Sequence, residues 1–357
     1  MSQIHDDTPV PEACYTPEVV RGLAEFCGRK DLSALDEELE SHLSEVCLEV
    51  PTSVLATRNW LRVPPRRIAL CGGGVRGVAH IGVLKVLQAE GLLGCVREIV
   101  GISAGSLFGL LVCCGYSLAD AERLALQFDF GKLRTLDIDS VLKFPTTYGL
   151  DSGDGLEKFI TAILKHQGLS PEITFRELAA CRPIRLRCFA TELQTARGRE
   201  FSVQTTPDVP VRIGIRASMS LPILYVPVPD FQSDSAALLM DGGLLNNLPL
   251  AFLTPEEIRD TWAVLFTTKP EGEAQKITDI WDVARYIYDA AFLMKTKPFL
   301  EYYSDHIICV PTHDFSSVNF EITSEQRSAL IARAAEEARK FLKAGTSRPP
   351  TRRMSIS

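Results

Sequence analysis

The stretch Arg66–Gly77, which reads RRIALCGGGVRG, leads a short apolar segment into a cluster of glycines. Residues 68–71 have the character of a buried strand, and the apolar spacing from Val75 to Glu90 predicts a helix that Gly91 ends. Adjacent glycines allow a sharp turn and let backbone N–H groups face a ligand. A helix that begins there adds its unpaired amides and the positive end of its dipole. We therefore expect this loop to bind negative charge, on a cofactor phosphate or on an oxyanion formed during catalysis.

A second glycine-flanked motif, Gly101-Ile102-Ser103-Ala104-Gly105, follows the next expected strand, Val96 to Val100. It matches G-x-S-x-G and precedes a helix expected from Ala104 to Gly115. The small flanking residues permit a tight, strained turn that exposes the serine hydroxyl at the helix N-terminus, where the dipole favours a developing alkoxide. We predict that Ser103 is a nucleophile and not part of a simple turn.

The glycine loop is compatible with two kinds of anion site. G-x-G-x-x-G after a strand is also a dinucleotide-binding fingerprint, which needs an acidic residue at the end of the following strand. That strand ends here in Gly101-Ile102-Ser103, and Glu90 and Glu98 lie before or inside it. The Gly-Lys-Ser/Thr sequence of a P-loop is also absent. The neighbouring serine motif favours an oxyanion hole, with the N–H groups of Gly73 and Gly74 as donors.

Two charged residues accompany these motifs. Asp241 ends an apolar strand expected from Ala236 to Met240 and precedes Gly242 and Gly243, so we expect its carboxylate at the carboxyl edge of a sheet, where sites form. A serine nucleophile needs a base, and we predict that Asp241 is that base. Arg76 has two open interpretations: it holds a substrate phosphate, or it is a solvated or loop-bracing side chain.

Histidines are the alternative bases. The chain order serine, aspartate, histidine admits His306 and His313, which both follow Asp241. His306 opens an apolar strand and His313 lies in an expected loop, and such positions are typical of surface or capping residues. His80, on the helix after the glycine loop, is expected to be packed or capping. We predict that replacing His306 or His313 by alanine leaves most of the activity.

The composition excludes several classes of protein. The 357 residues are 46% hydrophobic and 23% charged, as in an ordinary packed globule. The formal net charge of −7 argues against general nucleic-acid binding. We expect no signal peptide and no transmembrane segment, because the start lacks a basic and apolar leader and the longest apolar run, residues 107–114, is too short. Ten cysteines without C-x-x-C spacing predict reduced thiols and no metal site. We expect a cytoplasmic protein, with peripheral contact to membranes as a further option.

Strand and helix patterns alternate from residue 68 onward. This alternation predicts an α/β fold with three layers, in which helices cover both faces of a mostly parallel central sheet. Residues 1–65 form an expected N-terminal helical extension, which packs on the main domain or binds an unknown partner or a membrane surface. Pro64-Pro65 marks the boundary of the main domain, residues 66–345, and the tail 346–357 is expected to be disordered. Leu133 to Asp154 is expected to be rich in loops and is a candidate lid.

Together these motifs resemble the patatin-like phospholipase family over roughly residues 68–249. The resemblance rests on Gly72-Gly73-Gly74-Val75-Arg76-Gly77, on Gly101-Ile102-Ser103-Ala104-Gly105, and on Asp241-Gly242-Gly243 followed by Asn246-Asn247-Leu248-Pro249. The segments Ala217–Pro222 and Ala190-Thr191-Glu192-Leu193 also look like family blocks, although Glu192 stands in place of the family's aspartate. Cys71 stands where the family often has aspartate or serine, and we assign it no catalytic role.

The resemblance implies a lipid acyl hydrolase of the phospholipase A or lysophospholipase type, with a patatin-like fold and no metal or cofactor. Ser103 is then the nucleophile of a Ser–Asp dyad, Asp241 its base, and Gly73 and Gly74 the oxyanion donors. The implied substrate is a lipid or a membrane surface, and water releases the fatty acid from an acyl-serine intermediate. Two alternatives stay open: a transacylase with an alcohol or lysolipid as acceptor, and a catalytically silent lipid-docking or interaction protein.

Overall fold

The computed structural model describes residues 64–134, 138–230, 237–267, 277, 280–312, 315 and 320–346. Most of the expected N-terminal extension (residues 1–63), the tail from residue 347 and His313 lie outside the described residues. The division of the chain at residues 65 and 346 therefore stays a prediction.

An eight-stranded sheet forms the centre of the described fold, in the order β10-β9-β1-β2-β4-β8-β7, with β5 paired to β4. Strands β10, β9, β1, β2 and β4 run parallel, whereas β5 and β8 pair with β4, and β7 with β8, in the antiparallel sense. A separate parallel pair joins β3 to β6. The predicted α/β fold with a mostly parallel sheet is thus confirmed. The strands are β1 (Arg67–Leu70), β2 (Glu98–Ile102), β3 (Gly149–Asp151), β4 (Arg185–Glu192), β5 (Arg197–Phe201), β6 (Ile223–Tyr225), β7 (Val228–Pro229), β8 (Leu238–Asp241), β9 (Thr261–Thr267) and β10 (Ile307–Pro311).

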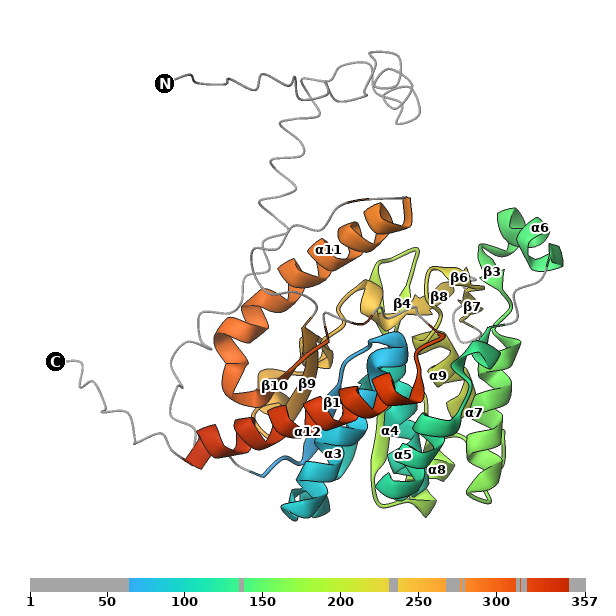
Figure 1. Cartoon of the computed structure of the whole chain (residues 1–357). Helices are drawn as coiled ribbons and strands as arrows, with labels where there is room; N and C mark the ends of the chain where they lie inside the picture. The colour runs from blue at the N-terminus through green and yellow to red at the C-terminus, as the bar shows by residue number, and fades with distance from the viewer. Residues whose placement is uncertain are drawn as a thin grey trace, which may run out of the picture. The chain divides into compact units, whose positions relative to one another are not determined.

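Helices follow most of the parallel strands (Figure 1). The α-helices are α3 (Ala79–Ala89), α4 (Ala104–Cys114), α5 (Leu118–Gln127), α6 (Ile138–Thr147), α7 (Asp154–His166), α8 (Phe175–Cys181), α9 (Val211–Ser218), α10 (Pro255–Ile258), α11 (Ile280–Tyr303) and α12 (Ser324–Thr346). Short 3-10 helices are η2 (Gly74–Val78), η3 (Leu92–Cys95), η4 (Phe130–Leu133), η5 (Gly242–Leu244), η6 (Pro249–Phe252) and η7 (Ser304–His306).

Different helical segments pack on the two faces of the sheet, and together with the sheet they form the three predicted layers. Helices α3, α4, α5 and α12 lie together in front of the sheet in Figure 1. A Cβ on Gly109 of α4 would lie 3.3 Å from the Leu186 side chain of β4, so Leu186 points toward this face. The Phe189 side chain, three residues further along β4, points to the opposite face of the sheet. Its ring stacks on that of Phe252 in η6, with the ring centroids 4.5 Å apart. The segment from η6 to α10 therefore covers the second face.

Two expectations about helices need correction. Leu133 to Asp154 is not mainly loop, because it contains α6 and β3. Pro145 inside α6 is unfavourable for a helix interior and hid this helix from the sequence pattern. The helix expected from Val75 to Glu90 is divided into η2 and α3.

Candidate active site

The glycine loop after β1 is packed so closely that side chains do not fit at three of its positions. A Cβ on Gly72 would lie 2.2 Å from Asn247 Oδ1, and one on Gly73 would lie 2.5 Å from the Phe266 ring. A Cβ on Gly77 would lie 2.8 Å from the Cβ of Ala104, which begins α4. Gly74 has φ 55°, in the left-handed region that favours glycine. The loop therefore lies directly against the G-x-S-x-G motif, as an oxyanion hole that serves Ser103 requires.

Ser103 occupies a strained turn between β2 and α4. Its φ of 52° and ψ of −126° are unusual for a residue with a side chain, and the turn needs the small residues on either side. A Cβ on Gly101 would lie 2.4 Å from the Ser106 Cα, and one on Gly105 would lie 2.1 Å from the Leu70 carbonyl oxygen. The serine thus stands at the N-terminus of α4, close to the carboxyl end of β1.

Asp241 is the last residue of β8. As expected, Asp241 ends an apolar strand, but this strand, β8, runs antiparallel to its neighbour β4. The register nevertheless brings the residue to the predicted place: Ile102 of β2 pairs with Phe189, and Asp241 pairs with the next residue of β4, Ala190. Ser103 and Asp241 therefore lie at the same level of the sheet, on either side of Ala190.

The Asp241 carboxyl group is buried and only partly hydrogen-bonded. Its Oδ1 accepts a hydrogen bond of 2.7 Å from the Gly243 N–H, while its Oδ2 has no hydrogen-bond partner among the described residues. Burial raises the pKa of this carboxyl from its ordinary 3.8 to about 6, against the lowering effects of the Ser103 hydroxyl and the Gly243 amide. At neutral pH the group is mostly ionised and can accept a proton.

Residues at the end of α9 and directly after it connect the two halves of this pair. The Ser218 Oγ accepts a hydrogen bond of 2.9 Å from the Ser103 N–H, and the Ser220 carbonyl accepts one of 2.8 Å from the Asp241 N–H. The Thr191 hydroxyl on β4 donates to the Asp241 carbonyl at 2.9 Å. Ser218, Ser220 and Thr191 belong to segments that resemble family blocks, but their polar contacts span distant parts of the chain and are not visible in the sequence.

Arg76 points into the protein. Its side chain is 9% exposed. Its Nε donates to the Gly73 carbonyl at 3.2 Å, and its Nη1 donates to the Thr312 hydroxyl at 3.4 Å. These contacts fit a side chain that braces the glycine loop and do not fit a side chain that is solvated.

His80 is part of the core next to the glycine loop. Its Nε2 donates to the Cys71 carbonyl at 2.8 Å, and its ring stacks on Phe266 with centroids 4.6 Å apart. Burial lowers the pKa of His80 to about 4, so the ring is neutral at physiological pH. Its role is to support the loop by packing.

His306 lies at the opposite edge of the sheet from Ser103. It ends η7 immediately before β10, and its Nδ1 donates to the carbonyl of Thr261, the first residue of β9, at 3.0 Å. Both strands begin at this edge, whereas Ser103 follows the carboxyl end of a strand parallel to them. Among the described histidines, none hydrogen-bonds to Asp241.

Replacing His306 by alanine is therefore expected to leave the rate of ester hydrolysis within about threefold of the parent, since surface changes away from a site have small effects. Steady-state kinetics on the purified variant measures this. A loss of about 100-fold in a folded His306→Ala protein would show that a histidine takes part in the chemistry and that the dyad is wrong.

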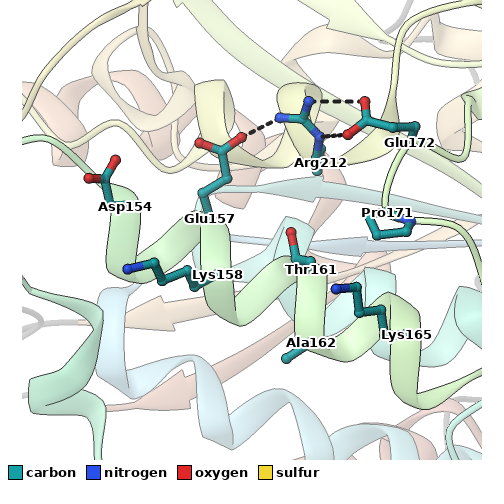
Figure 2. A pocket seen from close by; sticks show the side chains of 9 residues that line it. All are labelled: Asp154, Glu157, Lys158, Thr161, Ala162, Lys165, Pro171, Glu172 and Arg212. Atoms are coloured by element: carbon teal, nitrogen blue, oxygen red, sulfur yellow. Dashed lines mark hydrogen bonds and ion pairs between the residues drawn. The ribbon is translucent and has the colours of Figure 1, made fainter.

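A surface hollow with a volume of about 620 Å³ lies along α7, away from these motifs (Figure 2). Figure 2 shows Arg212 between Glu157 and Glu172, and its Nε lies 2.8 Å from Glu172 Oε1. Neither Ser103 nor Asp241 lines the hollow. Its lining consists of Asp154, Glu157, Lys158, Thr161, Ala162, Lys165, Pro171, Glu172 and Arg212. Within the hollow, Arg212 is paired with Glu157 and Glu172, and no residue of the two motifs lines it, so we do not assign the chemistry to it.

The described part of the chain contains neither a metal-binding cluster nor a membrane-spanning helix. Within it, no group of three or more His, Cys, Asp or Glu side chains is arranged to hold a metal ion. Nor does any described helix combine the length and apolar character needed to cross a membrane.

Known proteins resemble this chain in sequence and in fold. The family model described as patatin-like phospholipase matches residues 68–254, more than half of the 357 residues. The uncharacterized protein YqhO of Bacillus subtilis (strain 168) is 25% identical over 293 residues, 77% of this chain and 97% of that protein. A probable lipid hydrolase, 463L, of invertebrate iridescent virus 6 is 26% identical over 187 residues, 52% of this chain and 62% of that protein. The crystal structure of VipD from Legionella pneumophila shares the fold, with a TM-score of 0.55, 16% identity, and coverage of 79% of this chain and 67% of that one.

Proposed function

Because the chain belongs to the patatin-like phospholipase family, we propose that it hydrolyses fatty-acyl esters of lipids through an acyl-Ser103 intermediate, with Asp241 as the base. The proposal is carried by one arrangement: the nucleophilic turn and the buried, ionisable carboxyl lie on either side of Ala190, beside the glycine loop. The specific activity we assign is that of a phospholipase A or lysophospholipase.

The proposed reaction has two halves. Asp241 accepts the hydroxyl proton of Ser103, whose Oγ bonds to the ester carbonyl carbon while the carbonyl oxygen takes the negative charge. The N–H groups of Gly73 and Gly74 donate to this oxyanion. When the C–O ester bond breaks, the leaving alkoxide takes the proton from Asp241. Asp241 then accepts a proton from water, which attacks the acyl-serine, and the fatty acid leaves as Ser103 regains its proton.

A membrane surface as the site of action is supported by where large apolar side chains are exposed. In the described part of the chain, these side chains include Leu142, Tyr148, Leu193, Ile223, Leu293 and Met294. Leu193 follows the carboxyl end of β4, and α6, β3, β6 and the upper part of α11 project on that side of the sheet (Figure 1). The Lys295 ammonium donates to the Leu244 carbonyl at 3.0 Å, which ties α11 to the turn after Asp241. Exposed apolar side chains around a lipid-cleaving site fit contact with a bilayer, and the net charge of −7 makes apolar contact more important than charge.

The direct test uses purified protein and phospholipid vesicles with a labelled acyl chain. Release of labelled fatty acid supports hydrolysis. Transfer of the label to an added alcohol or lysolipid, with no net release, would identify a transacylase instead. Binding to the vesicles without turnover would favour the silent lipid-docking alternative.

The pH dependence of kcat/KM is expected to show the ionisation of Asp241. A general base must be deprotonated, so kcat/KM should rise with pH through the raised pKa of about 6 and reach a plateau above it. At pH 5 the value should be roughly tenfold below the plateau. The measurement needs an ester without a titrating group. A profile that is flat from pH 4 to pH 8 would rule out a base with this pKa.

A further inference from the structure

Each of the two proposed oxyanion donors belongs to a peptide group whose carbonyl is held by a buried side chain. In a trans peptide, the C=O of one residue and the N–H of the next lie in one plane and point in opposite directions. A hydrogen bond to the Gly72 carbonyl therefore fixes the direction of the Gly73 N–H, and one to the Gly73 carbonyl fixes that of Gly74. Glycine backbones rotate easily, so these peptide planes need such restraints.

Asn247 restrains the first peptide plane. Its Nδ2 donates to the Gly72 carbonyl at 2.9 Å, and its side chain is 8% exposed. A Cβ on Gly72 would lie 2.2 Å from the Asn247 Oδ1, so the amide packs directly against this glycine. Asn247 lies between η5, which follows Asp241 directly, and η6. One short segment therefore carries the proposed base and the restraint on the loop.

Arg76 restrains the second peptide plane. The Gly73 carbonyl accepts hydrogen bonds from the Arg76 Nε at 3.2 Å and from the Arg76 backbone N–H at 3.1 Å. The other end of the guanidinium donates to Thr312, which follows β10. The loop is therefore connected to the edge strand β10 as well as to the Asp241 segment.

We propose that Asn247 and Arg76 are positioning residues that hold the Gly73 and Gly74 N–H groups toward the reacting carbonyl, so that the oxyanion hole is formed before substrate binds. This inference rests on the proposed function. It assigns Arg76 to the loop and not to a substrate phosphate. Without the Asn247 hydrogen bond, the first peptide plane can turn and present its carbonyl oxygen, which repels an oxyanion. Without the Arg76 side chain, the second plane keeps only the hydrogen bond from the Arg76 backbone N–H and is less firmly held.

The test compares Asn247→Leu, which keeps the side-chain volume but cannot donate, with Asn246→Ala as the matched control. Asn246 is adjacent and accepts from the Leu248 N–H at 3.0 Å. On an uncharged monomeric ester, Asn247→Leu should lower kcat by about 100-fold and change KM by less than about threefold, because the lost contact acts on the transition state. The rate of inactivation by a fluorophosphonate should fall in parallel. Asn246→Ala should stay within about threefold of the parent.

Arg76→Met supplies a second test if Asn247→Leu does not fold. As a restraint on the loop, Arg76 should affect kcat equally on the uncharged ester and on a phospholipid, by about tenfold or more. A raised KM for the phospholipid alone would overturn the inference in favour of a phosphate ligand. An Asn247→Leu protein that is folded and retains the parent kcat would overturn it too. Failure of the proposed function itself is distinguishable, because the parent protein would then show neither turnover nor fluorophosphonate labelling.

Discussion

Replacement of Ser103 by alanine is expected to lower kcat for fatty-acid release by about 10⁵-fold or more, the loss typical of removing a serine nucleophile. The alanine leaves in place the backbone N–H that donates to Ser218, so the fold should be retained. The measurement is turnover of a labelled phospholipid by the purified variant, with circular dichroism as a check of folding.

Ser106→Ala is the matched control, because Ser106 is a buried serine in the first turn of α4 whose hydroxyl donates to the Ser103 carbonyl. It should reduce kcat by less than about tenfold, as expected for the loss of one hydrogen bond. A Ser103→Ala protein with one hundredth or more of the parent activity would contradict the assigned nucleophile.

Replacement of Asp241 by asparagine is expected to lower kcat by about 10⁴-fold, since an amide of the same shape cannot accept the serine proton.

The change of Asp241 to asparagine should also make the folded protein more stable at alkaline pH. Burial raises the pKa of this carboxyl from 3.8 to about 6, so its favourable contribution is complete below pH 3.8 and is lost as the pH rises through 6. At pH 8 the buried carboxylate costs on the order of 3 kcal/mol.

Urea denaturation of the parent and of Asp241→Asn at pH 8 and pH 4 measures this cost. The variant should have the larger free energy of unfolding at pH 8, and the difference should shrink at pH 4, where the parent carboxyl is protonated. A variant that loses activity and gains stability at pH 8 would show that the Asp241 carboxylate serves the reaction and not the stability of the fold. Lower stability of the variant at pH 8, together with substantial activity, would show that Asp241 has only a structural role.

The alternation of strands and helices was enough to predict the mostly parallel sheet, because the buried strands are short apolar runs and the helices have regular spacing. The turns around Ser103 and the glycine loop were also predictable, since glycines are required there by close packing. The direction of β8 was not predictable from the sequence, because it depends on how β8 pairs with β4, which is distant in the sequence, and not on the residues of β8. Helix α6 was missed because Pro145 and two threonines disfavour a helix locally.

The surroundings of the site were less predictable than its motifs. Arg76 is a charged residue that is usually expected at the surface, and its burial depends on Thr312, which is 236 residues away in the sequence. Asn247 belongs to a recognisable segment, but only the folded chain brings its amide to Gly72. Side-chain hydrogen bonds between distant segments leave no periodic signal in the sequence, and in this protein they restrain the glycine loop.

The most direct test of the central claim is covalent labelling of the active protein by a fluorophosphonate, followed by mass spectrometry of its peptides. With Ser103 as the nucleophile, we expect one stable phosphonyl adduct, on Ser103, which forms in parallel with the loss of esterase activity and does not form in Ser103→Ala. Loss of activity with the adduct on a different residue, or an active protein that resists labelling altogether, would contradict this expectation.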